Sequence, residues 1–127
     1  MKQPVELARR YLSLADRDIK TFRLLADVPD SDDAAVGFHA QQAAEKCLKA
    51  VLSFHKIPFR KTHNLDELVD LLEDHKKPAP PTPEMLDALN PFAVALRYDL
   101  IEMGSLDRNQ TRKIVEAVRR WAGEQVR

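Results

Sequence analysis

The side chains best suited to chemistry lie on one expected helix, between about residues 33 and 56. Spacings of three and four place five polar side chains on the face opposite its apolar stripe: His39, Gln42, Lys46, Lys49 and Ser53. Such a face offers a titratable imidazole and a line of hydrogen-bond donors. Two alternatives are open: a solvated face that stabilises the helix, or an edge that faces a phosphate or a protein partner. Gln41 and Glu45 lie beside this line, and Glu45 with Lys49 forms an i,i+4 pair typical of the first alternative.

Other common catalytic and metal-binding patterns do not occur in the sequence. Three scattered glycines cannot build a phosphate-binding loop, and there is neither a GxSxG nor an HExxH string. The four histidines lie 8 to 16 residues apart, which is not the spacing of a metal site: His39, His55, His63 and His75. The single cysteine, Cys47, excludes an internal disulfide framework and a cysteine-based metal cluster. We therefore expect no cofactor and no bound metal.

The elements that position these side chains are expected to be helices. Apolar periodicity, prolines and capping residues predict five helical segments: residues 4–28, 33–56, 65–76 behind an Asn64/Glu67 capping box, 84–96 with a kink or break at Asn90-Pro91, and a last helix capped by Asp107. No strand pattern and no internal repeat occurs. We expect an all-α, five-helix up-and-down bundle, built on a long antiparallel hairpin of the first two helices.

Length and composition place the whole chain, residues 1–127, in a single domain. With 44% hydrophobic and 31% charged residues the chain is expected to fold in water, and no apolar run is long enough for a membrane span. We expect a cytoplasmic protein without a membrane partner. Equal numbers of basic and acidic residues, 20 of each, argue against a protein that coats nucleic acid by bulk charge.

The charges are nevertheless distributed unevenly along the chain. Residues 1–28 carry six positive and four negative charges, and residues 105–127 carry six and three. If the first and last helices pack as neighbours, together they form a basic flank of about +5, since 12 − 7 = 5. This flank fits RNA or an acidic protein partner, and it also fits ordinary solvated helix faces.

Three segments of the sequence closely resemble the HEPN (higher eukaryote and prokaryote nucleotide-binding) domain family. They are residues 35–50, which read AVGFHAQQAAEKCLKA, then Thr62-His63-Asn64-Leu65, and later Arg97-Tyr98-Asp99. The resemblance implies a five-helix bundle and a homodimer, which a bundle this small also favours because it leaves apolar surface uncovered. It further implies a minimal nucleotidyltransferase as partner, in a pair that behaves like toxin and antitoxin. Many relatives of this kind are metal-independent ribonucleases.

The ribonuclease relatives share an arginine, four to six intervening residues and then a histidine, and this sequence departs from that pattern. After Arg97 the eligible positions hold Glu102, Met103 and Gly104, and no other arginine precedes a histidine by that spacing. A histidine there acts as base or acid on the ribose 2′-hydroxyl, whereas a glutamate repels phosphate. We therefore expect no ribonuclease activity of this type.

Two alternatives are open for the Arg97-Tyr98-Asp99 segment. In one, Arg97 pairs with Asp99 or Glu102 and holds the loop before the last helix, while Tyr98 closes the end of the bundle. In the other, Arg97 contacts phosphate and Tyr98 stacks on a base, or Tyr98 accepts a modification from the partner. The candidate nucleotide- or RNA-binding residues are Arg97, Tyr98, Asp99, His39, Lys46 and Lys49. The expected function is a non-catalytic or weakly active nucleotide- or RNA-binding partner; the alternatives are a divergent ribonuclease toxin and a purely structural interaction module.

Overall fold

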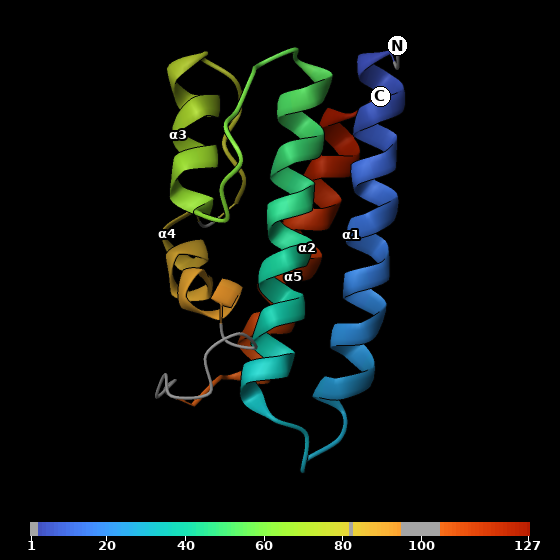
Figure 1. The fold of residues 1–127 in the computed structure, drawn as a ribbon, viewed down its shortest axis with the longest axis vertical. Helices are drawn as coiled ribbons and strands as arrows, with labels where there is room; N and C mark the ends of the chain where they lie inside the picture. Colours follow the sequence, from blue (N-terminus) through green and yellow to red (C-terminus); the bar gives the residue numbers. More distant parts are fainter. Residues whose placement is uncertain (1–2, 82, 95–104) are drawn as a thin grey trace.

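The computed structural model describes residues 3–81, 83–94 and 105–127, and these residues form helices and connectors without a strand. In chain order the elements are α1 (Pro4–Ala26), α2 (Asp33–Phe54), α3 (Leu65–Asp74), α4 (Pro83–Leu86), the 3₁₀ helix η1 (Asp87–Val94) and α5 (Arg108–Gln125). Figure 1 shows α1 and α2 side by side, joined by a short turn, with α5 behind them and α3, α4 and η1 along the other side of α2. The all-α prediction is confirmed.

Local side-chain chemistry sets the helix starts. The side chains of Asp32, Asn64 and Asp107 each accept a hydrogen bond from a backbone N–H in the first turn of α2, α3 and α5. These bonds satisfy donors that have no partner inside the helix. The long helices end two residues earlier than the apolar pattern predicts. In α2 the reason is Lys56, whose φ of 60° is left-handed and lets the Ile57 N–H reach back to the Leu52 carbonyl at 2.9 Å.

The fourth predicted helix differs most from expectation. The predicted break at Asn90-Pro91 is wrong in position, because the α-helix ends at Leu86 and a 3₁₀ helix continues through Pro91. A proline ring clashes with the carbonyl four residues earlier, which disfavours α-helical geometry before it. The Asn90 side chain also ties this segment to α3, accepting a hydrogen bond from the Leu65 N–H at 2.8 Å.

Helix α2 is the centre of the bundle, packed by α1, α3, η1 and α5. None of its residues, Asp33 to Phe54, is exposed. Gly37 is required where η1 crosses, because a Cβ there would lie 2.2 Å from the Phe92 ring. Cys47 is buried among apolar side chains, and this burial raises the pKa of its thiol to about 12.

Candidate functional site

The polar side chains of α2 meet partners from α1 and from the connector before α3. Asp18 of α1 receives two of them: its Oδ1 lies 3.1 Å from His39 Nδ1, and its Oδ2 accepts a hydrogen bond from the Lys46 ammonium. All three side chains are at least three-quarters buried. The carboxylate thus bridges two positions on α2 that lie seven residues, or about two turns, apart.

A second carboxylate, Glu45, has three partners. Its side chain is only 5% exposed and accepts hydrogen bonds from Lys49 Nζ at 3.0 Å and Gln41 Nε2 at 3.2 Å. His63 Nδ1 lies 2.8 Å from the same carboxylate, and Gln41 also donates to the His63 carbonyl at 2.9 Å. A buried carboxylate is costly unless it is paired in this way. We call the two clusters together the α2 seam: Asp18, His39, Gln41, Glu45, Lys46, Lys49 and His63.

The prediction that these polar side chains of α2 form an outer face is wrong. His39, Lys46 and Lys49 do lie on one side of the helix, but that side is covered by α1 and the connector, and each side chain is paired with a carboxylate. Ser53, predicted on the same outer face, is buried. A phosphate could reach these donors only by competing with Asp18 and Glu45. The predicted Glu45–Lys49 pair is present, at 3.0 Å.

The other predicted site residues, Arg97, Tyr98, Asp99 and Glu102, lie outside the described residues. At the N-terminal end of α5, side-chain hydrogen bonds tie this helix to the start of α2. Arg108 Nε donates to Asp33 Oδ1 at 3.0 Å, and its Nη1 donates to the Val28 carbonyl at 2.9 Å. The Leu106 N–H, together with Arg108, holds the pKa of Asp33 below its ordinary value.

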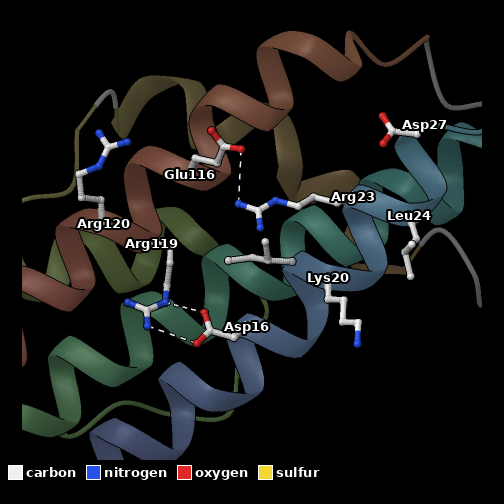
Figure 2. A pocket seen from close by; sticks show the side chains of 9 residues that line it. Asp16, Lys20, Arg23, Leu24, Asp27, Glu116, Arg119 and Arg120 are labelled. Carbon is white, nitrogen blue, oxygen red and sulfur yellow. Dashed lines mark hydrogen bonds and ion pairs between the residues drawn. The ribbon is translucent and has the colours of Figure 1, made fainter.

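A groove between α1 and α5 is lined by four basic side chains. It has a volume of about 720 Å³ and is shown in Figure 2. Ile19 and Leu24 supply apolar surface, and the charged lining residues are Asp16, Lys20, Arg23, Asp27, Glu116, Arg119 and Arg120. We call it the α1–α5 groove. Sequence reasoning identified the basic flank but not a groove within it.

Acidic side chains neutralise much of the predicted flank. Arg119 binds both carboxylate oxygens of Asp16, at 2.7 and 3.3 Å, which raises the pKa of the guanidinium. Arg23 reaches Glu116 only at 3.4 Å, with both side chains well exposed. Four cations and three anions line the groove, so its formal charge is 4 − 3 = +1.

Two of those cations, Lys20 and Arg120, have no ion-pair partner in the described part of the chain. With the loosely held Arg23, they can donate hydrogen bonds to an anion beside an apolar surface. The described residues that line the groove are charged or apolar, and their guanidinium and ammonium groups suit the binding of an anion.

No group of three or more metal-ligating side chains comes together within residues 3–81, 83–94 and 105–127. Across the same residues, no helix has the length and apolarity needed to cross a bilayer.

Comparison with known proteins gives one match. The family model of the HEPN domain matches residues 8–125 of the chain, from within α1 to the end of α5. No curated protein and no solved structure matches.

Proposed function

Because this chain belongs to the HEPN domain family, we propose that it binds a nucleotide or RNA without cutting it, as the partner of a minimal nucleotidyltransferase in a toxin–antitoxin-like pair. Family membership supports a nucleotide- or RNA-related function in general. The nucleotidyltransferase partner and the absence of cleavage go beyond what family membership supports. The absence of cleavage rests on the sequence pattern around Arg97, nucleotide binding rests on the α1–α5 groove, and the partner rests on the resemblance to the family.

The absence of cleavage follows from the residue types available. No arginine in the sequence is followed by a histidine after four to six residues, and Glu102 stands at the first eligible position after Arg97. A carboxylate near the scissile phosphate repels the substrate. In the α2 seam, His39 and His63 each hold a carboxylate through Nδ1, an arrangement that ties α1 and the connector to α2. The histidines therefore have a structural role that requires no substrate.

The observation that carries the binding proposal is the α1–α5 groove. Its volume of about 720 Å³ is in the range of small-molecule sites. Arg120 of α5 lines the groove together with Arg23 and Lys20 of α1, and in Figure 2 Arg23 extends from α1 toward Glu116 of α5. Basic side chains of both helices therefore border the groove. The exposed Leu24 side chain offers an apolar surface for a base. A formal charge of +1 suits one or two phosphates better than a long polyanion.

Calorimetric titration with adenosine triphosphate and with a short single-stranded RNA tests this site. We expect Arg120→Ala to weaken binding about tenfold, the loss of one charge-assisted hydrogen bond of about 1.4 kcal/mol. Lys113→Ala is the matched control, because Lys113 is also on α5 but lines a different pocket. Binding that Arg120→Ala leaves unchanged would place the ligand elsewhere, and no binding of either ligand would contradict the proposal.

The candidate segment Arg97-Tyr98-Asp99 is tested through Arg97→Ala. If Arg97 binds phosphate, the variant keeps its melting temperature and loses the rise in that temperature caused by nucleotide. If Arg97 is structural, the melting temperature falls without ligand. Growth arrest on induced expression, with RNA cleavage that Arg97→Ala abolishes, would show a ribonuclease toxin instead.

The partner is tested by co-purification. The product of an adjacent open reading frame with a nucleotidyltransferase signature is expected to co-purify with this chain when the two are expressed together. Two proteins that elute separately at micromolar concentration would contradict the pairing, while leaving nucleotide binding by the groove to its own titration.

A further inference from the structure

His63 is bound to α2 through one ring nitrogen and is open to solvent on the opposite part of its ring. Its Nδ1 lies 2.8 Å from the Glu45 carboxylate, while 43% of the side chain is exposed. Nε2 lies on the part of the ring away from Nδ1 and has no hydrogen-bond partner in the described part of the chain. Gln41 also fixes the backbone by donating to the His63 carbonyl at 2.9 Å. The imidazole is therefore presented to solvent in a fixed orientation.

The carboxylate partner determines which nitrogen of His63 carries the proton. An ionised carboxylate only accepts hydrogen bonds, so the neutral imidazole carries its proton on Nδ1 and keeps a lone pair on Nε2. The same carboxylate stabilises the positive charge that develops on the ring when Nε2 forms a bond. Lys49 Nζ at 3.0 Å and Gln41 Nε2 at 3.2 Å hold the Glu45 carboxylate in place. This arrangement prepares a histidine to act as a nucleophile.

The connector that carries this histidine has exposed basic side chains. Arg60 binds Glu67 through Nε and Nη2, and its Nη1 has no partner among the residues that the structure describes. Lys61 is also exposed and forms no ion pair with a described residue. With Glu45 and Lys49, these side chains comprise three cations and two anions, a net charge of 3 − 2 = +1. A neutral nucleophile beside a net positive charge favours an anionic electrophile.

We propose that His63 Nε2 is a modification site that accepts a phosphoryl group from a small acyl phosphate. The Nε2 lone pair forms the new bond to phosphorus, and the bond between phosphorus and the acyl oxygen breaks, leaving its electron pair on the departing carboxylate. The ring proton remains on Nδ1, where Glu45 holds it. The free Nη1 of Arg60 and the Lys61 ammonium supply hydrogen-bond donors for the phosphoryl oxygens.

The other three histidines of the chain each lack a feature that His63 has. His39 is paired with a carboxylate through Nδ1, but its side chain is only 24% exposed. His75 is exposed, but the partner of its Nδ1 is an uncharged backbone carbonyl at 2.8 Å. The Nε2 atom of His55 is buried without a partner. The chain thus contains its own comparison between access to solvent and a carboxylate partner.

This inference goes beyond the proposed nucleotide binding and concerns another surface. His63 is not among the residues that line the α1–α5 groove. His63→Asn, whose amide nitrogen can still donate to Glu45, is expected to bind adenosine triphosphate as tightly as the unaltered chain does. Arg120→Ala is expected to bind the nucleotide more weakly and to be phosphorylated at the unaltered rate. Each proposal can therefore fail without the other.

Incubation of the folded, full chain with acetyl phosphate tests the proposal. Peptide mass spectrometry at alkaline pH identifies the phosphorylated residue, and phosphorus nuclear magnetic resonance identifies the nitrogen that carries the phosphoryl group. We expect phosphorylation of His63 at Nε2, at least about tenfold faster than that of His75 or His39, a difference of about 1.4 kcal/mol in activation free energy. We expect no phosphorylation of His55 while the chain is folded.

Glu45→Gln separates the effect of the carboxylate charge from that of exposure. Glutamine keeps an oxygen that can accept from Nδ1 but has no charge, so we expect phosphorylation of His63 to slow about tenfold. Asp18→Asn is the matched control, because it makes the same kind of change at His39 and is expected to leave the rate at His63 unchanged. Thermal unfolding confirms that each variant is folded. If Glu45→Gln does not fold, the comparison of His63 with His75 in the unaltered chain still decides.

Three outcomes would overturn the proposal. His63 could be phosphorylated no faster than His75 in the unaltered chain, which would mean that the carboxylate partner has no effect on Nε2. A folded Glu45→Gln variant could react at the unaltered rate, with the same meaning. Acetyl phosphate could acetylate Lys61 and leave His63 unmodified, which would show that the connector attracts the reagent without a nucleophile at Nε2.

Discussion

The α2 seam and the α1–α5 groove contain similar side chains in opposite states. In the seam, Glu45 is 5% exposed and has three donors, and Asp18 holds both His39 and Lys46. In the groove, Arg23 and Glu116 are 3.4 Å apart and 56% and 40% exposed, and Lys20 and Arg120 are unpaired within the described residues. Polar groups satisfied within the chain stabilise the fold, and polar groups left unsatisfied are available to a ligand.

The predictions that follow test this contrast, from the largest expected effect to the smallest. The most severe change is Glu45→Ala in the seam. It leaves Lys49 and Gln41 without their acceptor in a nearly buried position, and we expect a loss of about 3 kcal/mol in the free energy of unfolding. Urea denaturation followed by circular dichroism measures it. A loss below about 1 kcal/mol would mean that the seam is as weakly coupled to stability as the groove.

Arg108→Ala is expected to have the next largest effect. Arg108 donates to Asp33 and to carbonyls at the end of α1 and in the turn that follows, and removing it leaves those acceptors without a charged donor. We expect a loss of about 2 kcal/mol by the same measurement. Arg112→Ala is the control, since Arg112 makes a single exposed pair with Asp27. Equal losses for the two variants would contradict the role given to Arg108.

In the groove, Glu116→Ala is expected to change stability by less than about 0.5 kcal/mol, because an exposed ion pair contributes little. The same change removes a carboxylate that competes for Arg23, so nucleotide binding is expected to become about two- to threefold tighter, a modest electrostatic effect. Calorimetric titration measures the binding. Weaker binding after Glu116→Ala would show that the Arg23–Glu116 pair supports the site.

The smallest effect concerns pH. The pKa of Asp33 is lowered from its ordinary value of 3.8 by the Leu106 N–H and Arg108. Its ionised form therefore contributes stability that is fully present above about pH 4 and is lost as pH falls through the folded-state pKa. We expect Asp33→Asn to reduce the dependence of stability on pH between about pH 5 and about pH 2. Unfolding curves at several pH values check this, and parallel curves for both proteins would contradict it.

The sequence predicted the all-α fold and the helix starts because both depend on neighbours in the chain. Apolar periodicity and the capping side chains of Asn64 and Asp107 act within a few residues, and the structure has both caps. The break in the fourth helix was predicted at Asn90-Pro91, whereas the α-helix ends at Leu86. The hydrogen bond that ties this segment to α3 joins residues 25 positions apart in the chain, which local patterns do not reveal.

The candidate site was harder to predict for the same physical reason. Gln41 and Glu45 are polar, and periodicity places polar residues outside; their burial depends on His63, which is far along the chain. Likewise, the basic flank is visible in the sequence, but Asp16 and Glu116 neutralise it only when α1 and α5 lie side by side. Charges can be counted from a sequence, whereas their pairing requires the fold.

The buried thiol of Cys47 can report how often the helix bundle opens. The reactive form of a cysteine is the thiolate, and a pKa of about 12 with almost complete burial keeps Cys47 unreactive while α2 is enclosed. It is the single cysteine of the chain, so a thiol reagent modifies the protein at the rate at which helices separate from α2. Labelling with and without nucleotide, or with and without a second copy, would then report how strongly each holds the bundle closed.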